Sequence, residues 1–185
     1  FYVDKTDREV EELREKNLLT ISDGASVVDL DEEKSGMPPC LILKKDGTTI
    51  YATRDIAAAL YRKETYDFDK CLYVVAYQQD LHFRQWFKVI EKMGYPWYKD
   101  LVHVAFGMIS YEGQSLSTRK GHVLFLEDVL NMAIEKARAI IEEKSPNLEN
   151  KDEVARQVGV GAVVYADLQN SRIKDIDFSW ERVLS

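Results

Sequence analysis

The sequence has few cysteines, few histidines and no long hydrophobic run. Its 185 residues include 2 Cys and 3 His, too few for the disulfide framework of a small secreted domain, so we expect a reducing, cytoplasmic environment. The longest apolar stretches, 71–77 and 158–166, are shorter than the roughly 18 to 20 residues of a membrane-spanning helix. The first residues show no basic segment followed by an apolar one, so no signal peptide is predicted.

Positive charge is also scarce. The chain has 25 Lys and Arg against 32 Asp and Glu, a net charge of -7. Non-specific binding to nucleic acid needs cations clustered on one face, so we do not expect it, and an anionic ligand requires a small local site. The three histidines are scattered and form no recognisable metal-binding pattern with the two cysteines. With 45% hydrophobic and 31% charged residues, the chain is typical of a globular protein.

The first 50 residues predict a helix followed by hairpins. Residues 4–17 combine dense charge with apolar positions three apart, Val10 and Leu13, which is typical of an exposed amphipathic helix. Short β-type runs at 19–21, 25–30 and 40–43 follow, and they are separated by Asp23-Gly24, by Gly36 with Pro38-Pro39, and by Asp46-Gly47. This pattern predicts a small antiparallel insertion.

Residues 51–125 predict an α/β layer. A helical segment at 53–63 precedes a continuous apolar run at 71–76, and a second apolar run covers 101–106. Between the runs, apolar residues recur at helical spacing until Gly94 ends the helix; they are Phe83, Trp86, Phe87, Ile90 and Met93. Strands without alternation, separated by helices, are typical of a parallel sheet covered on both faces. We expect a nucleotide-binding fold whose ligand lies beyond the carboxyl ends of the strands.

Residues 126–185 predict a helical part. One apolar stripe stops at Ser145-Pro146; it consists of Val129, Leu130, Ala133, Ile134, Ala137, Ile140 and Ile141. A second helix, about 152–168, is apolar on nearly every side in its second half, so we expect it to be buried between other elements. The chain is therefore predicted to have three parts, 1–50, 51–125 and 126–185.

The loop at 113–121 is the most informative polar segment. It is bounded by glycines and contains two adjacent cations, Arg119 and Lys120, together with the hydroxyl groups of Ser115, Ser117 and Thr118. Such a loop can fold over a polyphosphate and donate charge-assisted hydrogen bonds to it. A solvated turn with two surface cations is the alternative that the composition alone leaves open.

Tyr51 and Asp55 lie four residues apart, and therefore on one face of a helix that already includes Tyr51. An aromatic ring beside a carboxylate can receive a planar guanidinium group through cation-π stacking and a bidentate ion pair. The alternative is that Asp55 interacts with the helix dipole and pairs with Arg54 or Arg62.

The turn at 77–83 follows the first predicted parallel strand. Gln78, Gln79 and His82 are therefore expected to point into the ligand crevice, while Asp80 caps the helix. Capping and packing roles alone are the alternative. His103, inside the second apolar run, is typical of a core histidine whose hydrogen bonds are satisfied.

Taken together, five segments resemble the bacterial arginyl-tRNA synthetases, which are class I enzymes. The segments are Tyr51-Ala-Thr-Arg-Asp, Gln79-Asp-Leu-His-Phe, His103-Val-Ala-Phe-Gly-Met, Leu116-Ser-Thr-Arg-Lys-Gly and Asp177-Phe-Ser-Trp-Glu-Arg-Val-Leu. They occur in the order and at the spacing of that family, and together they cover the whole chain. The resemblance implies the second half of a Rossmann-like catalytic domain.

The resemblance also implies roles for individual residues. Tyr51, Asp55 and Gln79 correspond to residues that bind arginine, which agrees with the guanidinium receptor inferred from Tyr51 and Asp55. The residues expected near ATP are His82, Gly107, Met108, Ser115 and Thr118, and those expected to stabilise the transferring phosphates are Ser117, Arg119 and Lys120. The implied substrates are arginine, tRNA(Arg) and ATP with Mg²⁺; no tightly bound cofactor and no protein-held metal are expected.

Two features depart from the class I pattern. The class signature loop is Lys-Met-Ser-Lys-Ser, but Ser115-Leu-Ser-Thr-Arg aligns with it here, so Arg119 and Lys120 both stay candidates for the active cation. No His-Ile-Gly-His motif occurs. We therefore expect a fragment, inactive alone, whose first half would precede Phe1 and whose anticodon-binding helices would follow Ser185.

Three further expectations follow. A synthetase for another amino acid and a non-catalytic relative that binds a nucleotide or an amino acid stay open as alternatives. Tyr51, Asp55 and Gln79 are expected to converge at the mouth of the sheet, opposite the cationic loop around Arg119. An uncovered apolar patch is expected where the missing half would pack.

Overall fold

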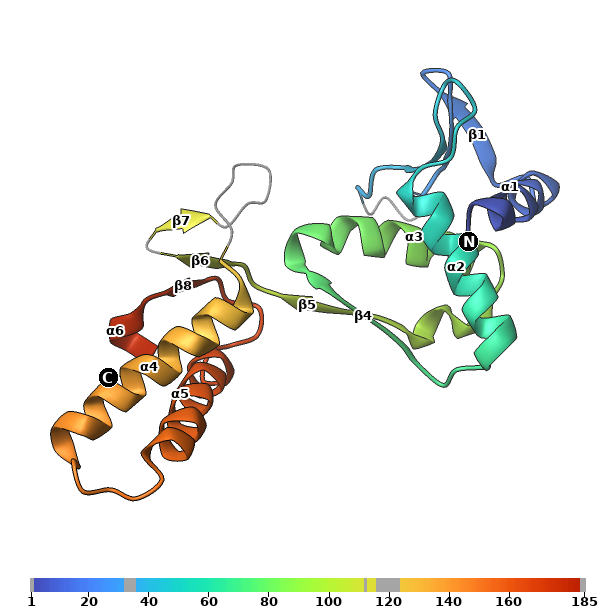
Figure 1. Cartoon of the computed structure of the whole chain (residues 1–185). Helices are drawn as coiled ribbons and strands as arrows, with labels where there is room; N and C mark the ends of the chain where they lie inside the picture. The colour runs from blue at the N-terminus through green and yellow to red at the C-terminus, as the bar shows by residue number, and fades with distance from the viewer. Residues whose placement is uncertain (1, 32–35, 112, 116–123, 184–185) are drawn as a thin grey trace. The chain divides into compact units, whose positions relative to one another are not determined.

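A computed structural model describes residues 2–31, 36–111, 113–115 and 124–183. The chain forms two compact units, Phe1–Ala105 and Phe106–Ser185 (Figure 1). Both combine helices with short strands, so the predicted mixed α/β character is confirmed.

The first unit begins with a helix and a small antiparallel sheet. A 3-10 turn, η1 (Val3–Lys5), leads into α1 (Thr6–Glu15), and the strands β1 (Leu19–Ser22), β2 (Ala25–Val28) and β3 (Cys40–Leu43) follow. The strands pair in the order β1-β2-β3. Asp23 and Gly24 have φ angles of 48° and 81°, the left-handed conformation that a two-residue hairpin requires. The predicted hairpin insertion is confirmed.

The rest of the first unit alternates helices and strands. In chain order it contains α2 (Tyr51–Tyr66), β4 (Cys71–Ala76), the 3-10 turn η2 (Tyr77–Gln79), α3 (Asp80–Lys92), the 3-10 turn η3 (Pro96–Asp100) and β5 (Leu101–Phe106). β4 and β5 pair in a two-stranded sheet, and their arrows run the same way in Figure 1. Gly94, with a φ angle of 90°, follows α3 and stops it.

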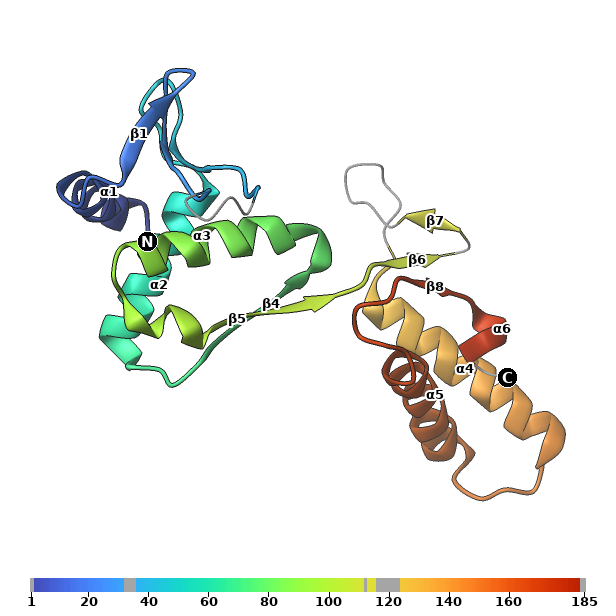
Figure 2. The ribbon, with the colours of Figure 1, turned by 180° about the vertical axis from the view of Figure 1, so that it is seen from behind.

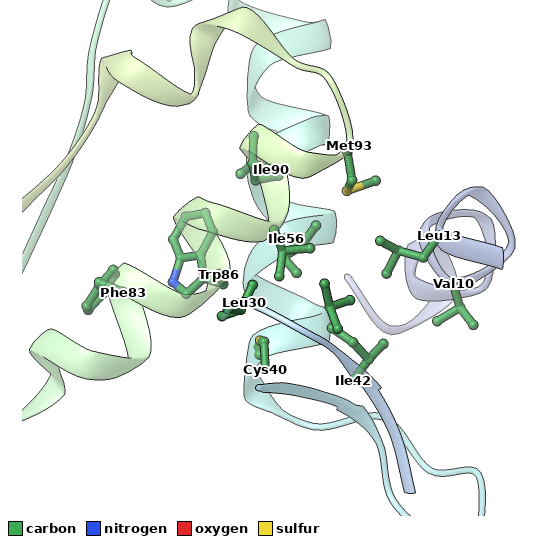
Figure 3. Packing of buried hydrophobic residues seen from close by; sticks show 14 of the residues in the cluster. Val10, Leu13, Leu30, Cys40, Ile42, Ile56, Phe83, Trp86, Ile90 and Met93 are labelled. Carbon is green, nitrogen blue, oxygen red and sulfur yellow. The ribbon is translucent and has the colours of Figure 1, made fainter. Parts of the chain in front are cut away.

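One hydrophobic core joins α1, the antiparallel sheet, α2 and α3 (Figure 3). α3 contributes Phe83, Trp86 and Ile90, the residues whose helical spacing predicted the helix. They pack with Leu13 of α1 and Ile56 of α2, which are fully buried. Burial of each such side chain contributes about 1.5 to 3 kcal/mol, so this core fixes how α3 lies against α2.

The face of β4 opposite the core is open. Tyr73 and Val75 pack against the core, but Leu72 is 59% exposed and Val74 is 65% exposed. The prediction that the sheet is covered on both faces is therefore wrong for the described chain, because a continuous apolar run does not show which partners cover it. The exposed Leu72 and Val74 form an uncovered apolar surface, as predicted, while the prediction that the missing half packs there stays a prediction.

The second unit combines a three-stranded sheet with a helical hairpin. β6 (Ile109–Tyr111), β7 (Gln114–Ser115) and β8 (Ile176–Phe178) pair in the order β7-β6-β8, with β6 and β8 parallel. α4 (Leu126–Lys144) and α5 (Lys151–Leu168) lie side by side in both views (Figures 1 and 2). The short helix α6 (Trp180–Val183) ends the described chain.

The predicted burial agrees with the structure for α4 but not for α5. Val129, Ala133 and Ala137 of the predicted α4 stripe are buried. The expectation that α5 is buried between other elements is wrong, because only Ala155 and Gly159 are buried on it and Leu168 is 74% exposed. An all-round apolar composition does not reveal how many sides of a helix have partners. No helix among the described residues combines the length and apolarity that a membrane crossing needs.

Glu9 is an unexpected buried carboxyl group on α1. It is 1% exposed, and neither of its carboxyl oxygens has a hydrogen-bond partner among the described residues. Burial raises the pKa of Glu9 to about 9, and the nearby backbone N–H of Ala57 offsets only part of this effect. The group is therefore protonated at neutral pH, which is why a helix predicted to be exposed tolerates it against α2.

We expect the stability of the chain to fall as pH rises because of Glu9. The raised pKa means that the folded chain keeps a proton that the unfolded chain releases above pH 4.5, so this contribution is lost as pH rises towards about 9. Relative to Glu9→Gln, the parent should lose up to about 1.4 kcal/mol of unfolding free energy per pH unit between pH 5 and 8. Urea unfolding at several pH values measures the free energy of unfolding of both proteins. If it depends on pH in the same way for the parent and for Glu9→Gln, the prediction is wrong.

Gly159 and Gly161 of α5 form a matched pair for testing the hairpin. A Cβ atom at Gly159 would lie 2.7 Å from the backbone nitrogen of Ile134, whereas one at Gly161 would meet nothing within 4 Å. We expect Gly159→Ala to destabilise the chain by about 1 to 3 kcal/mol, because the helices must separate. Gly161→Ala should stabilise it by up to about 1 kcal/mol through helix propensity. Thermal unfolding compares them, and equal shifts would refute the close approach.

Candidate functional site

Asp55 and His82 form a hydrogen-bonded pair that joins α2 to α3. Nε2 of His82 lies 2.6 Å from Oδ2 of Asp55. Since an ionised carboxylate only accepts hydrogen bonds, the imidazole donates through Nε2. The pair is partly exposed, at 40% for the Asp55 side chain and 25% for that of His82, so a ligand from solvent can reach it.

The partner of Asp55 differs from the simpler expectation of a pair with Arg54 or Arg62. Arg62 instead donates a hydrogen bond of 3.2 Å to the hydroxyl oxygen of Tyr73, and its guanidinium group lies over the rings of Tyr2 and Tyr73. Sequence reasoning missed the contact between Asp55 and His82 because it joins residues 27 positions apart.

Tyr51 and Gln79 lie close in the chain to the two members of this pair. α2 begins at Tyr51, so Tyr51 and Asp55 are one turn apart on the same face, as predicted. The ring of Tyr51 is 79% exposed. Gln79 is exposed and immediately precedes α3, three residues before His82. Among the described contacts none joins Tyr51 or Gln79 to Asp55, so the predicted three-residue pocket stays a prediction.

Asp80 does not cap α3, contrary to the sequence expectation. Gln79 holds the N-cap position without a side-chain cap, and Asp80 is the first helical residue. Its Oδ1 atom lies 3.6 Å from Nδ1 of His103. His103 is a core histidine as predicted, but only one of its ring nitrogens is satisfied. Its Nε2 atom lies 2.9 Å from the carbonyl oxygen of Val75, while Nδ1 has no hydrogen bond to any described residue.

Gly107 and Met108, which the resemblance places near ATP, are held by residues 172–176. The N–H of Met108 donates to Oδ1 of Asp175 at 2.7 Å, and its carbonyl accepts from the N–H of Ile176 at 2.9 Å. A Cβ atom at Gly107 would clash with the backbone carbonyl group of Lys174, so only glycine fits there. A ligand that used the backbone of Met108 would have to replace these bonds.

Asp177 of β8 holds the segment that leads into the predicted loop. Its Oδ1 atom accepts hydrogen bonds from the hydroxyl group of Ser110 at 2.7 Å and from the N–H of Gly113 at 2.9 Å. Ser115 lies in β7, while Ser117, Thr118, Arg119 and Lys120 lie outside the described residues. Sequence reasoning missed Asp175 and Asp177 as site residues; their spacing of two, which puts both on the same side of an extended segment, was the available signal.

A hollow of about 670 Å³ lies between α4, α5 and β8 in the second unit. Its lining is mainly aliphatic and includes Val129, Val163 and Ile176. Asp177 is among the lining residues, whereas Asp55, His82 and Met108 are not.

The comparisons with known proteins decide the family. The model of the class I (R) tRNA synthetase catalytic domain matches residues 1–180. The chain belongs to this arginyl-tRNA synthetase family. It is 65% identical over all 185 residues to the arginine–tRNA ligase of Clostridioides difficile (strain 630), and 59% identical over the same length to that of Alkaliphilus metalliredigens (strain QYMF). The chain spans 32% of the length of each of these curated relatives.

Solved structures of the family show the same fold. The arginyl-tRNA synthetase of Thermus thermophilus superposes on 99% of the chain with a TM-score of 0.83, at 23% identity and over 37% of its own length. That of Plasmodium falciparum superposes on the whole chain with a TM-score of 0.76, at 25% identity and over 31% of its own length. The mixed α/β architecture of the chain is therefore that of the family's catalytic domain.

We expect Asp177→Ala to free the backbone of Gly113. The substitution removes the oxygen that accepts from this N–H, so amide hydrogen exchange at Gly113 should accelerate about tenfold, as for the loss of one hydrogen bond. Asp177→Asn keeps an acceptor oxygen in the same place and serves as the control with a smaller change. Exchange measured by NMR distinguishes them, and an unchanged rate in Asp177→Ala would refute the anchoring role.

Proposed function

We propose that this chain is part of an arginine–tRNA ligase that activates arginine with ATP and transfers it to tRNA(Arg). The observation that carries the proposal is the 65% identity to such a ligase over the entire chain. The aligned region covers all 185 residues and therefore both compact units. The complete enzyme is the active species, and the chain alone is inactive.

Arginine is proposed to bind at Tyr51, Asp55 and Gln79. The hydrogen bond from His82 occupies Oδ2 of Asp55, which leaves Oδ1 to accept from the guanidinium group. The exposed ring of Tyr51, one turn away on the same helix face, can stack on the planar cation. The exposed amide of Gln79 can hydrogen-bond the substrate. This set distinguishes a guanidinium group from an ammonium group by its planar shape.

ATP is proposed to bind at His82, Gly107, Met108, Ser115 and Thr118, with Mg²⁺ accompanying the phosphates. Ser117, Arg119 and Lys120 are the proposed catalytic residues, because their hydroxyl group and cations can stabilise negative charge on the phosphates. The carboxylate of arginine attacks the α-phosphorus, the bond to the β-phosphate bridging oxygen breaks, and pyrophosphate leaves. Arginyl-adenylate then transfers its arginyl group to the terminal adenosine of tRNA(Arg). Catalysis rests on positioning and charge stabilisation.

The three predicted parts of the chain fit this function. We assign 1–50 to a connective insertion, 51–125 to the second half of a Rossmann-like domain, and 126–185 to the link towards an anticodon-binding domain. The exposed face of Leu72 and Val74 on β4 is apolar, which suits packing against the rest of a catalytic domain. A cytoplasmic location follows from the proposed role in protein synthesis.

We expect Asp55→Asn in the complete enzyme to raise the KM for arginine at least about 100-fold, because a charged partner of the guanidinium group is lost. The KM for ATP should change little. Asp67→Asn is the control, since Asp67 lies at the opposite end of α2 and asparagine also tolerates its left-handed backbone. Arginine-dependent exchange of pyrophosphate into ATP measures both constants. Equal arginine KM values for the two variants would overturn the arginine site.

The chain itself provides a second test of the proposal. The complete enzyme should exchange pyrophosphate into ATP with arginine and not with lysine, while this chain alone should show no exchange. Activation of another amino acid would favour the alternative of a different synthetase. A complete protein without any amino-acid activation would favour the alternative of a non-catalytic relative.

A further inference from the structure

We propose that His103 is a positioning residue for the arginine site, which it serves by clamping the corner between β4 and α3. This corner, η2 with the first turn of α3, carries Gln79 and His82. The inference deepens the proposed function and rests on it, because it gives a role to a buried histidine that touches neither proposed substrate.

The ring of His103 contacts the chain on both sides of the corner. On the β4 side, Nε2 lies 2.9 Å from the carbonyl oxygen of Val75. A carbonyl oxygen only accepts, so Nε2 carries the hydrogen. On the α3 side, Nδ1 lies 3.6 Å from Oδ1 of Asp80, and the ring stacks on Phe83 with centroids 4.3 Å apart and planes at 19°. The four residues 76–79 are held between these contacts.

The contacts of His103 affect the arginine site through His82. His82 lies between Asp80 and Phe83 in the first turn of α3, and its ring meets that of Phe83 edge-on at 5.5 Å. Its Nε2 atom is the one that donates to Asp55. If Phe83 or Asp80 shifts, His82 shifts with it, and the carboxylate of Asp55 loses the orientation that leaves one oxygen for the substrate.

The chemistry of the site explains why the residue is histidine. The side chain of His103 is only 7% exposed. An apolar ring, such as that of phenylalanine, could be buried there and stack on Phe83 equally well. Such a ring could not donate a hydrogen bond to the carbonyl oxygen of Val75. Nδ1 is buried and has no hydrogen bond among the described residues. Because Nε2 carries the hydrogen, Nδ1 can only accept a hydrogen bond, which the carboxylate of Asp80 cannot donate.

The test uses arginine-dependent pyrophosphate exchange by the complete enzyme. His103→Phe keeps the ring stacked on Phe83 but loses both nitrogens, and we expect it to raise the KM for arginine about tenfold while kcat changes little. His103→Gln restores a donor near the position of Nε2 and should recover part of the loss.

Trp86→Phe is the matched control for general destabilisation. Trp86 is a fully buried ring on the same helix, one turn beyond Phe83. It should lower the melting temperature without a selective change in the KM for arginine. If His103→Phe leaves that KM unchanged, or behaves like Trp86→Phe, the positioning role is overturned.

An NMR measurement on the chain itself separates this inference from the proposed function. Nitrogen shifts of the imidazole should show His103 with its hydrogen on Nε2, and a hydrogen on Nδ1 alone would overturn the clamp whatever the enzyme does. If the parent enzyme fails to activate arginine, the proposed function fails, and the role of His103 in an arginine site fails with it. An active parent with an unaffected His103→Phe variant overturns the inference alone.

Discussion

The burial of one face of α3 is the constraint on which the first unit depends. Phe83, Trp86 and Ile90 pack into the core shared with α1, α2 and the antiparallel sheet. Because the positions of a helix are geometrically fixed relative to one another, this packing also determines where the first turn points. His82 thus meets Asp55, and Asp80 faces His103. The polar contacts of the candidate site are consequences of an apolar interface.

Local signals predicted much of the fold. The hairpins were predictable because Asp23-Gly24 and the other turn residues act over a few positions. α2 was predictable from its helix-forming residues, and α3 from the helical spacing of its apolar residues. The burial of individual side chains was harder to predict from the sequence. The charged Glu9 is buried, while Leu72 on β4 and Leu168 on α5 are exposed, and each outcome depends on which elements pack from elsewhere in the chain. The amino-acid composition of a segment shows whether its side chains are apolar, but not which other elements cover them.

The candidate site divides in the same way. Tyr51 and Asp55 could be paired from the sequence because four residues make one helical turn. His82 as the partner of Asp55, and Asp177 as the anchor of Gly113, could not, since these contacts join residues 27 and 64 positions apart. Resemblance to a family supplied the proposed role of His82 near ATP, but it gave no role to Asp177. The spacing of Asp175 and Asp177 was visible in the sequence, but the backbone groups that they hold were not.

The open face of β4 has a consequence for handling the protein. Leu72 and Val74 project from a strand in a two-stranded sheet, and flat apolar strand surfaces associate readily with one another. At high concentration, copies of the chain should therefore associate through this face. Dilution should reduce this association. The net charge of -7 makes the copies repel one another, which opposes the association, and added salt weakens this repulsion.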